Sequence, residues 1–249
     1  MSVVSREAAV PADSRFKLLT NVIVSPHAAF LALRERPTAL FPLGLLILSS
    51  VLVTFLYYKT VDFEWFVDHL VQARVASSGS SIPLDQQEKM HAALASVSPT
   101  VMGIFSAASA ALLMCVVFFG IALYLNIISV LTGDGFKLKN WLSLVSWCAL
   151  PMLTALLVTL ISLFISDRQL APEHMNPLSF SNLLALDASG AARPNGLLQY
   201  TDPTVLWALG LAIVGYRRWT GRSMLTSVLI FLAPVIFVTG ISLWTGSSA

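Results

Sequence analysis

The sequence has few charged residues. Lysine, arginine, aspartate and glutamate make up 11% of its 249 residues, whereas apolar residues make up 56%. Apolar runs of about 20 residues recur, which is the length needed to cross the hydrocarbon core of a bilayer. This composition is not that of a soluble globular domain and indicates an integral membrane protein.

Motifs of soluble enzymes are also missing. The sequence contains no phosphate-binding glycine loop followed by Lys-Ser/Thr, no His-Glu-x-x-His and no Gly-x-Ser-x-Gly. Its two cysteines, Cys115 and Cys148, lie inside apolar runs, where we expect them to pack as small hydrophobic side chains without a disulfide. No apolar run has an ionisable side chain near its middle, as ion-coupled transporters usually require. The sequence therefore predicts no catalytic residue and no cofactor.

Five apolar runs predict five transmembrane helices in an all-α fold. The fourth is marginal, because its apolar part, residues 205–216, would rise only about 18 Å as a helix. It can span only if the helix begins at Pro203, Asp202 caps it and the arginines at its end snorkel. The predicted crossings are residues 39–58, 101–131, 141–165, 203–219 and 224–244, within a membrane domain of residues 38–249 that follows a segment of residues 1–37.

The distribution of basic residues predicts the orientation. Under five crossings, ten of the fifteen lysines and arginines share one face: five in the N-terminal segment, two in the second loop and three in the fourth. The positive-inside rule then places the N-terminus in the cytoplasm and the C-terminus outside. Because basic charge is used in this way, we expect no nucleic-acid partner, and the start of the chain predicts no removable signal peptide. The predicted topology anchors are Arg34, Arg36, Lys137, Lys139, Arg217, Arg218 and Arg222.

The N-terminal segment should contain a helix before the first crossing. Ser25 is a good N-cap and Pro26 suits the first helical position, so residues 27–36 are predicted to be helical until Pro37 stops them. The preceding residues alternate apolar and basic side chains. They predict a short amphipathic stretch that either lies on the inner leaflet or packs beneath the helix bundle.

Two external loops, residues 59–100 and 166–202, are predicted to form a small cap. Apolar residues recur at near-helical spacing from Phe63 to Val71, and several of them are aromatic, which indicates an amphipathic helix at the membrane surface. A Ser/Gly break should end that helix, and a more polar helix should follow at residues 83–97. The second loop has one apolar patch, at residues 178–186.

Three histidines of these loops are candidate metal ligands. His69, His91 and His174 lie among carboxylates, and imidazole with carboxylate suits zinc or a similar ion. No two of them have the close spacing of a metal-binding motif. Ordinary surface histidines are therefore the favoured interpretation.

The second crossing carries the clearest packing features. Gly103, Ala107 and Ala111 recur at intervals of four, so they would let another helix approach closely, and a helix of the same chain is the favoured partner. Asn126 is predicted to form a hydrogen bond to a neighbouring helix. In the third and fifth crossings, Pro151 and Pro234 permit kinks.

Several segments resemble the bacterial branch of the Yip1 family. They are Asn21-Val-Ile-Val-Ser-Pro26 with Ala29-Phe30 and Leu33-Arg-Glu-Arg-Pro37, then Tyr57-Tyr58 with Thr60-Val-Asp62, and residues 136–151. The resemblance covers nearly the whole chain and implies five transmembrane helices with a cytoplasmic N-terminus. Eukaryotic members of the family act in vesicle traffic through small GTPases. Their Asp-Leu-x-Gly-Pro signature is absent here, so the resemblance does not imply GTPase binding.

These features predict a non-enzymatic protein of the bacterial inner membrane. It would act as a scaffold or interaction partner, through helix packing with a second copy or with another envelope protein, and its other contacts would be membrane lipids. The alternative is a channel or transporter for a neutral or lipidic substrate, with a cavity shaped by the kinks at Pro151 and Pro234. A weaker alternative is a lipid-modifying enzyme.

Overall fold

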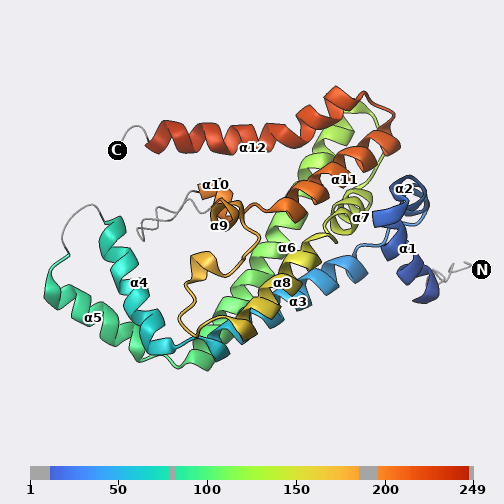
Figure 1. The fold of residues 1–249 in the computed structure, drawn as a ribbon. Coiled ribbons are helices and arrows are strands. Elements are labelled where there is room, and N and C mark those ends of the chain that lie inside the picture. The colour runs from blue at the N-terminus through green and yellow to red at the C-terminus, as the bar shows by residue number, and fades with distance from the viewer. Residues whose placement is uncertain (1–11, 79–81, 185–195, 247–249) are drawn as a thin grey trace, which may run out of the picture. The chain divides into compact units, whose positions relative to one another are not determined.

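The computed structural model describes residues 12–78, 82–184 and 196–246. Within these ranges every regular element is a helix and no strand occurs, which confirms the predicted all-α class (Figure 1). Predictions for residues 1–11, 79–81 and 185–195 lie outside the described part. The elements are α1 Ala12–Val24, α2 Pro26–Glu35, α3 Leu40–Thr60, α4 Phe63–Ser77, α5 Leu84–Ala95, α6 Pro99–Thr132, α7 Leu138–Cys148, α8 Met152–Ile165, the 3-10 helix η1 Pro172–His174, α9 Phe180–Leu183, α10 Gly196–Gln199, α11 Pro203–Thr220 and α12 Met224–Gly246.

Two helices, α3 and α6, are long and apolar enough to cross a membrane. A third span results if α7 and α8 count as one broken helix, and residues Met224–Phe237 of α12 form a shorter apolar helix. Helices therefore stand at all five predicted positions, but length and composition support two or three spans among the described residues. The five crossings and the orientation of the termini stay predictions.

The two prolines have different surroundings. Pro151 lies in the break between α7 and α8, so the predicted third crossing is two helices rather than one. A proline ring clashes with the carbonyl four residues earlier and supplies no N–H, which explains why the helix ends here. Pro234, in contrast, lies within α12, which continues without a break.

The chain divides into two compact units, each built from segments that are distant in sequence. Unit 1 consists of residues 1–40, 121–150 and 209–249, and unit 2 of residues 41–120 and 151–208. The long helices α6 and α11 contribute residues to both units. The predicted boundary between residues 37 and 38 is not tested by this division and stays a prediction.

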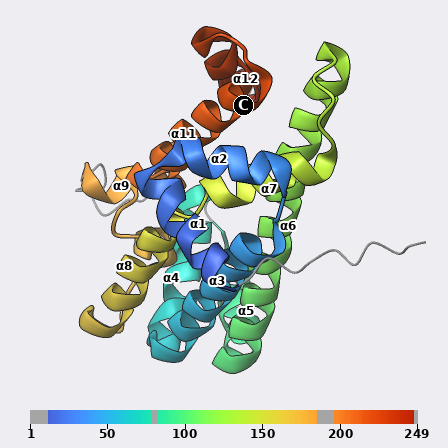
Figure 2. The same ribbon diagram turned by 90° about the vertical axis from the view of Figure 1, so that its right-hand side faces the viewer.

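In unit 1, α2 packs on α7 (Figure 2). Three apolar residues of α2 are buried, so this helix packs against the rest of unit 1: Ala29, Phe30 and Leu33. The indole N–H of Trp219 donates to the Phe30 carbonyl at 2.7 Å. The indole N–H of Trp147 donates to the Thr38 carbonyl at 2.6 Å. Each buried indole thus packs its ring and satisfies its single donor.

The start of α2 follows the prediction only in part. The helix begins at Pro26, but the Ser25 side chain forms no cap hydrogen bond. The Ser25 carbonyl instead accepts the backbone N–H groups of Ala28 and Ala29. The Ser25 carbonyl thus already satisfies the Ala28 N–H, one of the donors that a serine hydroxyl would cap.

In unit 2, a cluster of buried apolar residues joins α3, α4 and α8. Its members include Val53, Tyr57, Phe66 and Leu163. The Tyr57 hydroxyl donates to the Leu170 carbonyl at 2.8 Å, which holds the segment after α8 against α3. The predicted loop helices are present as α4 and α5, and α4 starts where the Asp62 carboxylate accepts the Trp65 N–H. No residue of α5 is buried.

Candidate ligand pocket in unit 2

A pocket of about 280 Å³ lies among α3, α6 and α8 of unit 2. Apolar side chains form most of its wall, including Leu46 and Val53 of α3, Phe118 of α6, and Met152 and Ala155 of α8. Two of these helices, α3 and α6, are the ones that qualify alone as candidate membrane spans. The volume is close to the lower end of small-molecule pockets, about 300 Å³.

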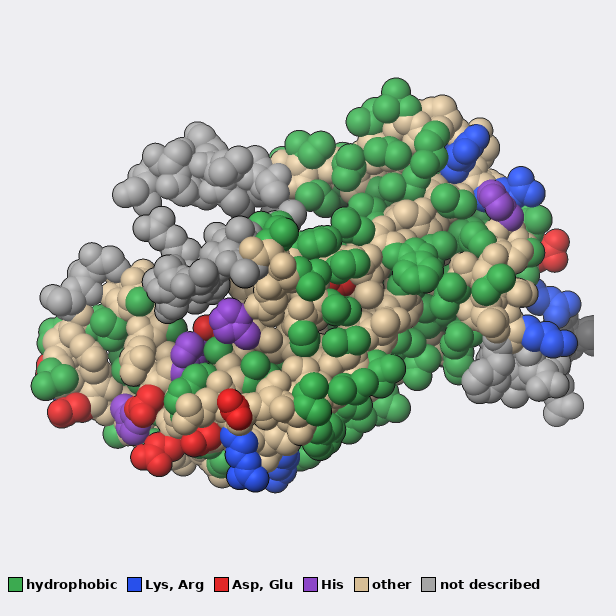
Figure 3. Space-filling model, viewed as in Figure 1, with side chains coloured by type: hydrophobic (Ala, Val, Ile, Leu, Met, Phe, Trp, Pro, Cys, Tyr) green, Lys and Arg blue, Asp and Glu red, His purple; other side chains and the backbone are tan. Residues whose placement is uncertain are grey.

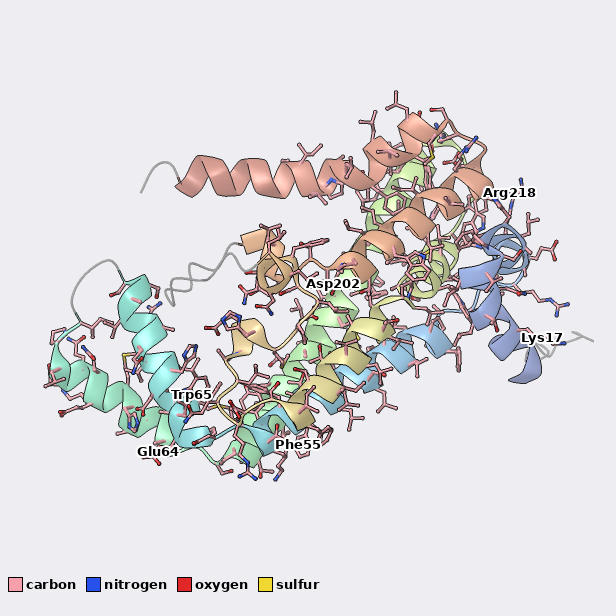
Figure 4. All side chains as sticks on the ribbon, viewed as in Figure 1. Lys17, Phe55, Glu64, Trp65, Asp202 and Arg218 are labelled. Atoms are coloured by element: carbon pink, nitrogen blue, oxygen red, sulfur yellow. The ribbon has the colours of Figure 1, made fainter. Side chains whose placement is uncertain are left out.

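The other end of the pocket is polar. Glu173 and Asn176 come from the segment around η1, Gln199 from the end of α10, and Asp202 from the residue before α11. Figure 4 labels Asp202 at the start of α11. None of the described residues that line the pocket is a lysine, arginine or histidine, so among them this end offers hydrogen-bond acceptors and amide groups rather than cations.

Asp202 is the most constrained residue of this end. Asp202 is only 4% exposed to solvent. One carboxylate oxygen accepts the Thr204 N–H at 2.7 Å, the Thr204 hydroxyl at 2.6 Å and the Val205 N–H at 3.1 Å, while Asn176 donates to the other at 2.9 Å. Asp202 therefore caps α11, as the sequence predicts. Four hydrogen bonds offset the cost of burying the carboxylate.

Gln199 supplies an acceptor that the protein does not use. Its Oε1 atom is buried and has no hydrogen-bond partner among the described residues. A buried acceptor without a donor costs about 1–3 kcal/mol, so a ligand or water that donates to it would be favoured. The other polar residues at this end have partners within the protein. Asn176 donates to Asp202, and Glu173 lies 2.7 Å from His69.

The apolar wall and the polar end of the pocket together indicate the class of ligand that it would bind. An apolar chain would contact the wall between the helices, and a hydroxyl or amine could donate at the Gln199 end. A phosphate or carboxylate would meet Glu173 and Asp202, and the described lining residues include no lysine or arginine to attract it. The pocket therefore fits a neutral or cationic amphiphile better than an anion.

The three candidate metal-binding histidines have separate partners. His69 Nε2 lies 2.7 Å from Glu173 Oε1, His91 Nε2 lies 3.0 Å from Asp68 Oδ1, and His174 Nδ1 lies 2.6 Å from Asn182 Oδ1. Figure 3 shows purple histidines and red carboxylates near one another on this part of unit 2. Within the described ranges, no three metal-ligating side chains come together in a group that could hold an ion.

The small residues of α6 lie against α3. A Cβ atom on Gly103 would come within 3.1 Å of Tyr58 Cβ, and the Ser106 hydroxyl donates to the Tyr58 hydroxyl at 3.0 Å. Ala107 is 4% exposed and Ala111 is half-buried. The close approach therefore occurs between two helices of the same chain.

The hydrogen bond predicted for Asn126 stays a prediction. The Asn126 side chain is half-buried and forms no hydrogen bond with another described residue. Its neighbour Tyr124 makes a contact between helices, because the Tyr124 hydroxyl donates to the Ile230 carbonyl of α12 at 2.8 Å. Asparagine is the more polar residue, but the longer tyrosine side chain reaches the other helix.

The predicted topology anchors of unit 1 differ in their contacts. The Arg34 guanidinium lies 5.3 Å from the centre of the Phe136 ring, and Arg222 Nη2 donates to Asp134 Oδ1 at 3.0 Å. The hydrogen bond to Asp134 raises the pKa of the Arg222 guanidinium. The remaining anchors are exposed to solvent or membrane surroundings: Arg36, Lys137, Lys139, Arg217 and Arg218.

The pocket itself could not be found by sequence reasoning. Leu46, Met152 and Gln199 belong to segments far apart in the chain, and each is an ordinary residue in its own segment. Asp202 alone has a recognisable signal, because an aspartate followed by proline predicts the start of a helix. The break at Pro151 is a second hint, since α8 begins directly after it and lines the pocket.

The fold is that of a helical membrane protein with two or three candidate spans. A family model described as the Yip1 domain matches residues 20–246, nearly the whole chain, so the protein belongs to the Yip1 domain family. No curated protein and no solved structure matches the chain.

Proposed function

We propose that this Yip1-domain protein binds a lipid-like amphiphile in the pocket of unit 2. The apolar part of the ligand lies among α3, α6 and α8, and a hydroxyl or amine donates to Gln199. The observation that carries the proposal is the pocket's lining, which is apolar at the depth of two candidate spans and rich in acceptors at one end. Lipid handling of this kind corresponds to a carrier or channel for a neutral or lipidic substrate.

We assign the pocket a binding role rather than a catalytic one. Asp202 already accepts four hydrogen bonds from the chain, so its carboxylate is used to cap α11 and to hold Asn176. The proposal includes five crossings, a cytoplasmic N-terminus and the bacterial inner membrane. These rest on the basic residues and on the family resemblance.

Native mass spectrometry of the purified chain tests this proposal. Wild-type protein should carry a co-purified amphiphile. Ala155 is 6% exposed and lines the pocket, so Ala155→Phe should fill the pocket and reduce the retained ligand at least tenfold. Ala108→Phe is the matched control, because Ala108 is exposed on α6 and does not line the pocket.

A second variant separates loss of the ligand from loss of the fold. Gln199→Leu leaves the apolar wall intact and removes the unused acceptor, so it should change which headgroup is retained while the melting temperature stays within a few degrees. The proposal is wrong if wild-type protein carries no amphiphile from any membrane extract, or if Ala155→Phe carries as much as Ala108→Phe.

We also propose that the chain associates with a second copy of itself through the hairpin of α4 and α5. The observation in favour is α5, which forms a complete helix without one buried residue and leaves Leu84 70% exposed. In a Cys115→Ser background, Gln86→Cys on α5 should form crosslinked dimers in native membranes, whereas Ser109→Cys, exposed on α6 outside the hairpin, is the control and should not. If Gln86→Cys remains monomeric, another envelope protein becomes the partner to seek.

A further inference from the structure

A second hollow, of about 440 Å³, lies in unit 1 where α11 ends and α12 begins. Its polar lining is basic, with His27 from the first turn of α2, Arg217 and Arg218 from the last turn of α11, and Arg222 from the turn before α12. None of the described residues in its lining is acidic. Figure 3 shows blue side chains beside a purple histidine in this region, and Figure 4 labels Arg218 on α11.

Arg222 is a fixed part of the wall. Gly221 has φ +70°, which lets the chain turn sharply out of α11, and the Arg222 N–H then donates to Thr220 Oγ1 at 3.4 Å. Its guanidinium is held by Asp134 at 3.0 Å, and the Asp134 side chain is only 9% exposed. The Thr132 hydroxyl donates to the other Asp134 oxygen at 2.7 Å. The charge of Arg222 is therefore balanced and its position is set.

Arg217 and Arg218 have no such partner. Both are exposed, and no acidic side chain of the described residues forms an ion pair with either. Both residues line the hollow and give it a positive potential, so an anion in it would be stabilised. Guanidinium groups present paired N–H donors that match the oxygens of a phosphate.

Helix ends reinforce the positive character of the hollow. His27 lies in the first turn of α2, where the Ser25 side chain makes no cap, and Met224 begins α12. Both ends carry backbone N–H groups without helical partners and a partial positive charge. The position of the two arginines at the end of α11 is also favourable for that helix alone. Arg222 lies in the turn outside α11 and lines the same hollow, so the basic lining goes beyond what stabilising α11 requires.

We propose that this hollow binds a phosphate group, with Arg217 and Arg218 as its ligands and Arg222 as a fixed wall. The phosphate belongs either to the headgroup of an anionic phospholipid or to a soluble phosphate ion. This site differs from the unit 2 pocket in residues and in ligand charge, so it does not depend on the function proposed for that pocket.

The test uses the full chain in detergent, titrated with short-chain phosphatidylglycerol and, separately, phosphatidylcholine, with binding read by native mass spectrometry. Wild-type protein should bind phosphatidylglycerol at least tenfold more tightly than phosphatidylcholine. Arg217→Gln with Arg218→Gln should weaken phosphatidylglycerol binding by about tenfold for each guanidinium removed. Lys137→Gln with Lys139→Gln removes the same charge from residues outside the hollow, and should change binding less than threefold.

A second arm identifies the source of the phosphate. Displacement of phosphatidylglycerol by inorganic phosphate would support a soluble phosphate ligand, and retention would support the lipid headgroup. Arg217→Lys with Arg218→Lys keeps the charge and loses the paired donors, so it should bind between wild type and the glutamine variant while remaining folded. The proposal would be overturned if the double arginine-to-glutamine variant and the double lysine-to-glutamine variant lost the same amount of phosphatidylglycerol binding. So would equal wild-type binding of the two lipids, if inorganic phosphate also leaves the melting temperature unchanged.

Discussion

Gly215 of α11 provides the sharpest test of the packing in unit 1. A Cβ atom at this position would lie 2.5 Å from Leu144 Cδ1 and 3.3 Å from two carbons of the Phe30 ring. Leu144 and Phe30 are both 0% exposed, so neither can move aside into free space. We therefore expect Gly215→Ala to disrupt the contact of α11 with α7 and α2.

The magnitude follows from a comparison within the same helix. A Cβ atom on Gly210 would have no neighbour within 4 Å, so Gly210→Ala should gain only the helix preference of alanine, about 0.5–1 kcal/mol. Gly215→Ala gains the same preference, but the overpacking costs about 1–3 kcal/mol. The two variants should therefore differ by about 1–3 kcal/mol, with Gly215→Ala the less stable.

Thermal unfolding in detergent, followed by tryptophan fluorescence, measures this difference. Trp141 stacks on Tyr216 with ring centres 5.4 Å apart, and Tyr216 is the residue after Gly215, so the signal reports on the region that is changed. Gly215→Ala should melt several degrees below Gly210→Ala. If it melts at or above the temperature of Gly210→Ala, the close contact of α11 with α7 and α2 is refuted.

Three further predictions concern other contacts. Gly103→Ala would place a Cβ atom 3.1 Å from Tyr58 Cβ, whereas a Cβ atom on Gly120 would have no neighbour within 4 Å. The melting temperature of Gly103→Ala should therefore be lower than that of Gly120→Ala. Equal melting temperatures would argue against close packing of α6 on α3. Asp202→Ala removes the cap of α11 and should lower the free energy of unfolding by about 1–2 kcal/mol, measured by thermal unfolding. Asp202→Asn should lower it less. The reverse order would show that Asp202 does not act as the cap. Asp134→Asn weakens the hold on Arg222, so it should lower phosphatidylglycerol binding less than loss of Arg217 and Arg218 does.

The positions of the helices are largely predictable from the sequence. Long apolar runs indicate α3 and α6, and local signals such as Pro26, Asp202 and the Ser/Gly break after α4 mark helix ends. These signals act over a few residues, so they can be recognised without knowing the fold. The number of membrane crossings is harder to predict from the sequence than the helix positions. Helix α11 ends in two arginines and α7 carries Lys139, so both helices are ambiguous as spans.

Contacts between distant segments could not be predicted. The polarity of Asn126 predicts a bridge between two helices, but nothing in the sequence predicts the bridge that the Tyr124 hydroxyl forms, because reach and direction depend on where α12 lies. The pocket of unit 2 depends on the same kind of information. Its unused acceptor, Gln199, ends the short helix α10, and its apolar wall comes from three helices whose adjacency only the structure reveals.

Photocrosslinking with a lipid that carries a reactive group on its acyl chain tests the central claim most directly. If an amphiphile occupies the unit 2 pocket, crosslinks should map by mass spectrometry to residues 46–54 and 152–159, and Ala155→Phe should reduce them while Ala108→Phe does not. Crosslinks confined to the outward residues of α6, such as Leu112, Leu113 and Val116, and unchanged by Ala155→Phe, would contradict the account.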